Sequence, residues 1–184
     1  MNPFVKRVED DSRAWVERAV VGLNLCPFAK TVHVKGQIHF SVSLAQSAPD
    51  LLLDLGIELD ALVALDCAQR DTTLLMAPSC MNDFLQFNDF LVPAQRLLRK
   101  RGLLGVVQLA SFHPAYQFAG ASSDDITNFT NRAPYPTLHL LREASIERAV
   151  LAISDPTAIY EANMETLRRL GPAGWAALRV GPSR

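Results

Sequence analysis

The sequence has few cysteines, no long apolar run and no excess of charge of either sign. Its three cysteines include no Cys-x-x-Cys pair, which argues against a disulfide framework and indicates reduced thiols. No stretch approaches the roughly 20 apolar residues that a membrane-spanning helix needs. The N-terminus lacks the apolar core of a signal peptide and soon turns acidic. We therefore expect a cytoplasmic protein that does not interact with membranes.

Charge and motif content exclude several further classes of protein. The formal net charge is −1 and the isoelectric point is near 6.4, so nothing attracts the whole chain to nucleic acid. The one dense basic run, at 96–101, is expected at a helix end, where it complements the helix dipole. The sequence contains no Walker loop, Gly-x-Gly-x-x-Gly, Gly-x-Ser-x-Gly, His-Glu-x-x-His or EF-hand loop. It therefore indicates no familiar chemistry and no particular cofactor.

Length and periodicity predict a single α/β or α+β domain with a small three-stranded sheet. The ordered core is expected at 9–171, followed by a Gly/Pro-rich tail that frays. Helical crossovers between the strands favour parallel pairing, and Pro93 is expected to kink or divide its helix. The predicted strands cover 37–44, 72–77 and 103–112, and the predicted helices 9–25, 50–67, 81–100, 137–152 and 156–170, the last two closing the chain.

The longest irregular stretch, residues 113–136, is the first candidate for a functional site. It follows the last predicted strand, and parallel sheets bind ligands beyond the carboxyl ends of their strands. Loops of this length in compact domains are functional or disordered, and the aromatic residues here argue against disorder. The alternative is a loop held to the domain by its own side-chain hydrogen bonds. The stretch and its flanks carry His113, Tyr116, Gln117, Asp124, Asp125, Asn128, Asn131, Arg132, Tyr135, His139, Arg142 and Glu143.

Two histidines in this region are candidates for chemistry. His139 and Glu143 lie four residues apart on a predicted helix, so their side chains would share a face. The pair suits metal ligation, a general base held by a carboxylate, or an ordinary polar pair. His113 is a second acid/base candidate, and with His139 and Glu143 it would complete a candidate metal site.

Cys26 is the candidate nucleophile, although its position is unfavourable. It follows the C-terminus of a predicted helix, where the dipole disfavours a thiolate. Lys30 or His113 would have to supply a neighbouring positive charge. The alternative is that Cys26 is a small buried apolar residue in a packing turn.

Arg132 and Arg142 lie on either side of a Pro-Tyr-Pro segment. The prolines stiffen this segment, so the two guanidinium groups would be held in place to bind a carboxylate or phosphate. The alternative is that both arginines pair internally with Asp124, Asp125 or Glu143.

Three sequence blocks resemble a mainly bacterial family, domain of unknown function 1415. The blocks are Asn24-Leu-Cys-Pro-Phe-Ala-Lys30, Gln108-Leu-Ala-Ser-Phe-His-Pro114 with Tyr116-Gln-Phe-Ala-Gly120, and Asn131-Arg-Ala-Pro-Tyr-Pro-Thr-Leu-His-Leu-Leu-Arg-Glu143. The resemblance extends from Trp15 to about Gly171 and implies no activity, substrate or cofactor. Ala133 stands where the family is expected to have serine, which argues against a chemical role at that position.

These observations support three functional hypotheses. In the first, the protein is a small-molecule enzyme whose site forms where the 113–136 loop meets the 26–30 turn. In the second, it binds a small anionic ligand without converting it. In the third, the polar blocks only brace a scaffold. The residues expected to act are His113, His139, Cys26 and Glu143 in catalysis, and Arg132, Arg142, Asn131, Tyr135, Tyr116 and Lys30 in ligand binding.

Overall fold

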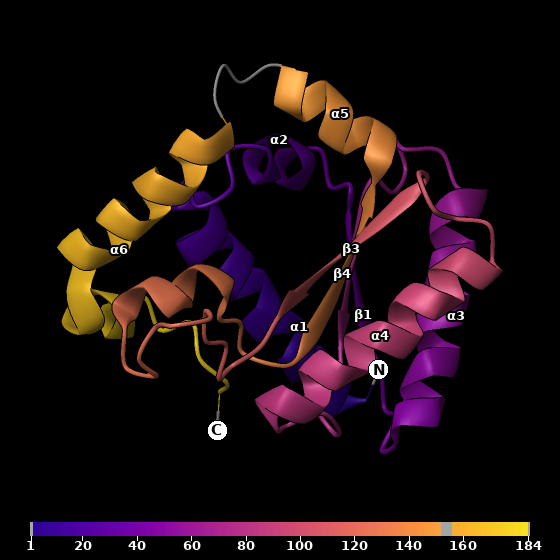
Figure 1. The fold of residues 1–184 in the computed structure, drawn as a ribbon, viewed down its shortest axis with the longest axis horizontal. Coiled ribbons are helices and arrows are strands. Elements are labelled where there is room, and N and C mark those ends of the chain that lie inside the picture. The colour runs from indigo at the N-terminus through magenta and orange to yellow at the C-terminus, as the bar shows by residue number, and fades with distance from the viewer. Residues whose placement is uncertain (1, 152–155, 184) are drawn as a thin grey trace.

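The protein is built on a four-stranded mixed sheet. The computed structural model describes residues 2–151 and 156–183. The strands follow the order β1-β2-β4-β3, with β1 and β2 parallel and β4 antiparallel to both of its neighbours (Figure 1). Their bounds are β1 (Ile38–Val42), β2 (Thr72–Met76), β3 (Val107–Phe112) and β4 (Thr137–Arg142).

Helices connect the strands and begin where the sequence supplies caps. The Ser47 side chain accepts a hydrogen bond from the backbone amide of Asp50 at the start of α3, and Asp83 does the same for Gln86 at the start of α4. No described helix is both long enough and apolar enough to cross a bilayer. The helices are α1 (Pro3–Trp15), the π-helix η1 (Val16–Val21), α2 (Ala29–Val34), α3 (Ala48–Ala64), α4 (Phe84–Lys100), the 3-10 helix η2 (Ile126–Asn131), α5 (Glu143–Leu151) and α6 (Pro156–Ala177).

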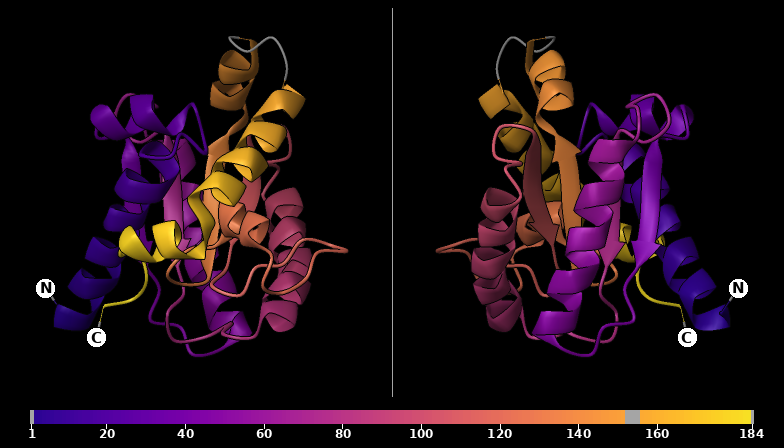
Figure 2. Two further views of the ribbon diagram at one scale, coloured as in Figure 1. Left: turned by 90° about the vertical axis from the view of Figure 1, so that its left-hand side faces the viewer. Right: turned by 90° about the vertical axis from the view of Figure 1, so that its right-hand side faces the viewer.

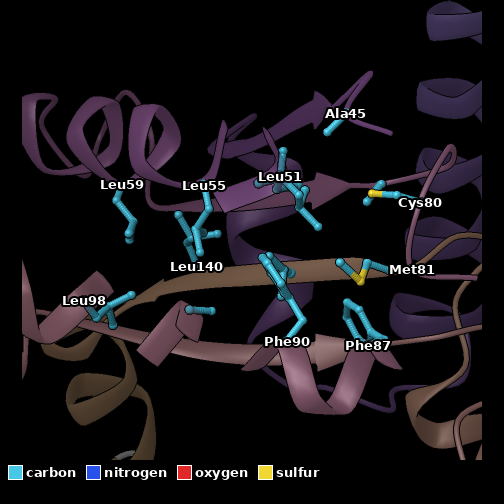
Figure 3. Packing of buried hydrophobic residues seen from close by; sticks show 14 of the residues in the cluster. Ala45, Leu51, Leu55, Leu59, Cys80, Met81, Phe87, Phe90, Leu98 and Leu140 are labelled. Atoms are coloured by element: carbon cyan, nitrogen blue, oxygen red, sulfur yellow. The ribbon is translucent and has the colours of Figure 1, made fainter. Parts of the chain in front are cut away.

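Helices α3 and α4 cover one face of the sheet, which we call the first side (Figure 1). Their leucine and phenylalanine side chains pack on alternate residues of β2 and β4 to form the main core (Figure 3). Leu138 and Leu140 of β4 point into this core, since successive side chains of a strand point to opposite faces. The buried members from the two helices are Leu51, Leu55, Leu59, Leu62, Phe87, Phe90, Ala94 and Leu98.

Helices α1 and η1 pack against the opposite face, which we call the second side. Trp15 and Val16 bury their side chains there against Phe40 and Leu74 of the strands. The N- and C-terminal ends of the chain lie at the same end of the molecule (Figure 2). The backbone amide of Ser183 donates to an Asp11 carboxylate oxygen at 3.0 Å. The second side thus brings together the two ends of the sequence.

The α/β class is confirmed, but the expected sheet of three strands was wrong. Residues Thr137–Arg142, expected to begin a helix over 137–152, form β4, and the helix α5 starts only at Glu143. β4 lies between β2 and β3 and pairs with both, so it satisfies backbone groups on two strands at once. The pairing is also not all parallel, because β4 runs against its neighbours.

Smaller differences have local causes. β3 starts at Val107 rather than at 103, since Gly105 has a positive φ of 76° in the turn before it. Helix α4 is not divided at Pro93 and continues to Lys100. The short helix α2 was not predicted. The predicted helix end at 170 matches a break in α6 at Gly171, whose φ is 66°. The tail was expected to fray after this point, but helical residues resume up to Ala177 and Val180 is buried in the second-side core.

Candidate functional site

His113 is a buried residue with both ring nitrogens occupied. It follows the last residue of β3 and is 1% exposed. Its Nε2 lies 3.0 Å from the carbonyl oxygen of Met81, and its Nδ1 accepts the backbone amide of Ala115 at 3.0 Å. Phe84 and Phe87 of α4 pack against the ring. Burial lowers the pKa of His113, so the imidazole is a neutral brace between the β3 end and the segment before α4.

His139 lies in the middle of β4 and points to the second side. Its Nε2 is 2.7 Å from the hydroxyl of Thr72, and that hydroxyl donates to the carbonyl oxygen of Leu140 at 2.7 Å. Desolvation lowers the pKa of His139 to about 4, so the ring is neutral at physiological pH. No described residue forms a hydrogen bond with its Nδ1. His139 therefore has one nitrogen in use and one available.

On the second side, His139 lies between the buried Leu74 of β2 and residues of β3. Strand register pairs His139 with Ala110, and Gln108 and Phe112 lie two residues away on the same face. The Phe112 ring is 5.9 Å from the imidazole between centroids, and Gln108 is exposed. We call His139 and these three residues of β3 the His139 face. It combines an imidazole, an amide and an aromatic ring beside a small side chain, at the open edge of the sheet.

The two candidate histidines do not converge. His113 packs against α4 on the first side, whereas His139 points to the second side, so the sheet separates them. Glu143 no longer shares a helical face with His139, because the two residues lie on different elements. Within residues 2–151 and 156–183, no three His, Cys, Asp or Glu side chains gather as metal ligands do.

Arg132 braces the long loop instead of facing an open site. Its Nε donates to the carbonyl oxygen of Tyr116 at 3.1 Å and its terminal nitrogen to that of Ser123 at 2.7 Å. The guanidinium also stacks on the Phe129 ring at 4.3 Å. The loop is further closed by Asn128, which accepts from the amide of Phe118 and donates to a backbone carbonyl oxygen. These bonds match the alternative of a loop held together by its own side chains.

Arg142 binds the C-terminal end of α3. One terminal nitrogen donates to the carbonyl oxygens of Leu62, Leu65 and Arg70 at 2.6, 2.7 and 3.0 Å. Carbonyl oxygens at a helix C-terminus lack partners within the helix and carry partial negative charge. Arg142 therefore ties β4 to α3, and its partners are backbone oxygens rather than the carboxylates considered from the sequence.

The remaining candidates are dispersed. The Tyr135 hydroxyl donates to the Asp11 carboxylate at 2.7 Å, and its burial together with this bond raises the pKa of the phenol. Tyr116 packs between aromatic rings of α4 and of its own loop. Lys30 is exposed on α2, and Cys26 is a half-buried free thiol in the turn before it. Asn131 ends η2, and its backbone carbonyl accepts the amide of His113.

Sequence reasoning missed a charged network on the first side. Arg70 is almost fully buried and forms an ion pair with Glu58, which also accepts from the Ser41 hydroxyl at 2.8 Å. The Nε of Arg70 donates to Thr73 at 2.8 Å. A hollow of about 130 Å³ beside this network is lined by Ser41, Val42, Ser43, Asp54, Ile57, Glu58 and Leu75. The one available signal was the alternation of 37–44, which places His39, Ser41 and Ser43 on a common face.

Thr72 was also missed, although it contacts the candidate His139 directly.

Comparison with curated proteins and comparison with solved structures gave no match. A family model does match residues 7–177, and it includes every strand, the long loop and the His139 face. The chain therefore belongs to the family described as protein of unknown function DUF1415.

Proposed function

We propose that the protein binds a small polar molecule on the His139 face, with the His139 imidazole as the central contact. The observation that carries this proposal is the unequal use of the two ring nitrogens. Nε2 is held by Thr72, and Nδ1 has no partner among the described residues. Polar atoms of largely buried side chains are usually hydrogen-bonded, so an accessible ring nitrogen without a protein partner is a natural contact for a ligand or a water molecule.

Accessibility of Nδ1 supports the proposal. No fully buried side-chain nitrogen or oxygen in the described part of the chain lacks a hydrogen-bond partner. Since Nδ1 has none there, it retains accessible surface, and His139 as a whole is only partly buried. Ala110 beside it contributes only a single methyl group. Phe112 offers a ring against which a ligand can pack.

The geometry favours recognition over catalysis by the long loop. Backbone groups are the hydrogen-bond partners described for His113, Arg132 and Arg142. These side chains therefore do not support a catalytic or anion-binding cluster in the long loop. A pKa near 4 also makes His139 a weak proton acceptor at neutral pH. Three free cysteines support the further proposal that the protein works in the reducing cytoplasm of a bacterial cell.

A fragment screen by nuclear magnetic resonance tests the binding proposal. A library of small polar compounds is added to ¹⁵N-labelled protein, and the backbone amide shifts are followed. Compounds that bind are expected to move the amides of Ala110 and His139, and the His139→Ala variant should lose these shifts. Incubation of each bound compound with the protein, followed by product analysis, then separates an enzyme from a binding protein.

His39→Ala is the matched control for this screen. His39 lies on β1, which is not adjacent to β4 or β3, and its side chain is 45% exposed, so its removal should leave binding unchanged. Binding that survives in His139→Ala, or that is lost equally in His39→Ala, would contradict the proposal.

A further inference from the structure

We propose that Thr72 is a positioning residue that fixes the tautomer of His139, so that the site selects uncharged ligands that donate a hydrogen bond. The inference rests on the proposed binding function and names the ligand class for the same face. Thr72 is 5% exposed on β2, and its hydroxyl lies between the imidazole of His139 and the carbonyl oxygen of Leu140.

The assignment follows from counting protons. A carbonyl oxygen can only accept, so at 2.7 Å from Leu140 the Thr72 hydroxyl must use its single hydrogen as the donor. The hydroxyl oxygen then has only lone pairs left for His139, and Nε2 at 2.7 Å must carry the ring proton. A neutral imidazole has one N–H, so Nδ1 is left unprotonated. The nitrogen that lacks a partner is therefore an acceptor.

This polarity decides which ligands fit. An unprotonated Nδ1 attracts an N–H or O–H group and repels the lone pairs of a carboxylate or phosphate. No lysine or arginine belongs to the His139 face, and both arginines near it in the sequence are tied to carbonyl oxygens. The exposed Gln108 amide adds a second group that both donates and accepts. Amides and other uncharged donors suit this face, whereas small anions do not.

The alternative role for Thr72 is a purely structural hydrogen bond between β2 and β4. Both roles predict that loss of the hydroxyl lowers stability, so stability cannot separate them. The protonation pattern of the His139 ring can separate them, because a merely structural threonine would leave it unchanged.

The test reads the ring nitrogens of His139 by ¹⁵N nuclear magnetic resonance, in which protonated and unprotonated imidazole nitrogens have well separated shifts. The chain has four histidines, and the His139→Ala variant identifies the signals of His139. Wild-type protein should show a protonated Nε2 and an unprotonated Nδ1. Thr72→Val should shift the population toward protonated Nδ1, and Thr72→Ser should restore the wild-type pattern.

Two internal controls come from the chain itself. Thr73→Val removes a hydroxyl from the next residue of β2, on the opposite face, and should leave the His139 signals unchanged. His113 is held by Met81 and Ala115 and should keep one tautomer in every variant. A wild-type His139 protonated at Nδ1, or a folded Thr72→Val protein with the wild-type pattern, would overturn the inference. If Thr72→Val does not fold, the wild-type and Thr72→Ser spectra still decide it.

Acetamide and acetate test the ligand class, since they match in size but differ in charge and in the presence of N–H donors. Acetamide should move the Nδ1 signal of His139 at lower concentration than acetate. An equal or larger response to acetate would overturn the assigned ligand class. A response to neither probe would count against the proposed binding function, while the tautomer result would still decide the role of Thr72.

Discussion

The two sides of the sheet are built differently, although they share the same strands. On the first side, the leucine and phenylalanine layer of α3 and α4 covers β2 and β4, and the Arg70–Glu58 network lies beside β1. On the second side, the apolar cluster lies over β1 and β2 and reaches Phe112 of β3, while Gln108 and Ala110 of β3 lie beside His139 of β4. Helix α1 contacts β1, and its last residue, Trp15, also packs against Phe112 of β3. Both sides thus combine an apolar core with polar groups. Those of the first side bind one another, whereas Nδ1 of His139 on the second side has no partner among the described residues.

Under the proposed function, this difference separates stability from ligand binding within one sheet. β4 contributes to both, because Leu138 and Leu140 point to the first side and Thr137 and His139 to the second. The strand period of two thus allows a single element to anchor the fold and to present a binding group. The predictions below test whether the two sides contribute as unequally as their packing indicates.

The largest effect is expected from a cavity in the first side. Leu55 of α3 is 0% exposed among core residues, and Leu55→Ala should lower the free energy of unfolding by about 3 kcal/mol. Urea unfolding followed by circular dichroism measures this loss. Leu53→Ala is the matched control on the same helix, because Leu53 is 68% exposed and its truncation should change stability little. Equal effects of the two substitutions would contradict the packing of α3.

Acid is expected to destabilise the protein because His139, on the second side, resists protonation in the folded state. The pKa of His139 is about 4 in the folded chain and near 6.5 in the unfolded chain, so the unfolded state binds the extra proton first. The stabilising effect of a neutral His139 is complete above about pH 6.5 and is lost as the pH falls toward 4, by about 3 kcal/mol in total. Burial lowers the pKa of His113 in the same direction.

Urea unfolding at a series of pH values measures this dependence. His139→Gln removes the titrating group while retaining an amide that can donate to Thr72, so its stability should fall less between pH 6.5 and 4 than that of wild type. A variant with the wild-type pH dependence would show that His139 is not the responsible group. The difference between the two curves isolates the second side from His113 on the first.

Much of the fold could be predicted from local sequence patterns, and strand β4 is the main exception. Three strands and the α3 and α4 helices have periodicities that match their structure. β4 was read as helix because its leucines at 138, 140 and 141 run into the helical pattern of α5 without an intervening loop. A strand buried on both faces has no simple alternation, so a short apolar run does not separate strand from helix. Its central position depends on β2 and β3, which the local sequence does not reveal.

The candidate site was harder to predict because the role of each side chain depends on hydrogen-bond partners far away in the sequence. His139 was identified from its residue type alone, whereas its partner Thr72 lies 67 residues earlier. Arg132 and Arg142 were read as anion ligands, and their partners are carbonyl oxygens, which every residue has and no sequence pattern marks. Residue type therefore indicated where polar chemistry is concentrated, but not which groups are already satisfied.

Arg142→Lys tests the link between β4 and the first side. Lysine retains the charge but cannot reproduce the planar fork that reaches several carbonyl oxygens at the end of α3. The free energy of unfolding should fall by about 2 kcal/mol, because hydrogen bonds from a charged donor are lost. Arg96→Lys is the control, since Arg96 is exposed and forms no ion pair within the described chain. A smaller loss for Arg142→Lys than for Arg96→Lys would contradict the bracing role.

The smallest effect is expected where the second side ties the ends of the chain together. Tyr135→Phe removes one hydrogen bond to Asp11 without opening a cavity, so it should cost about 1 kcal/mol. Asp11 also accepts the amide of Ser183, so the C-terminal residues should exchange their amide hydrogens faster in this variant while α3 and α4 stay protected. Hydrogen exchange measured residue by residue distinguishes this local loosening from a uniform loss of stability. Uniform acceleration would mean that the two sides respond as one cooperative unit, and that their different packing does not make them energetically separable.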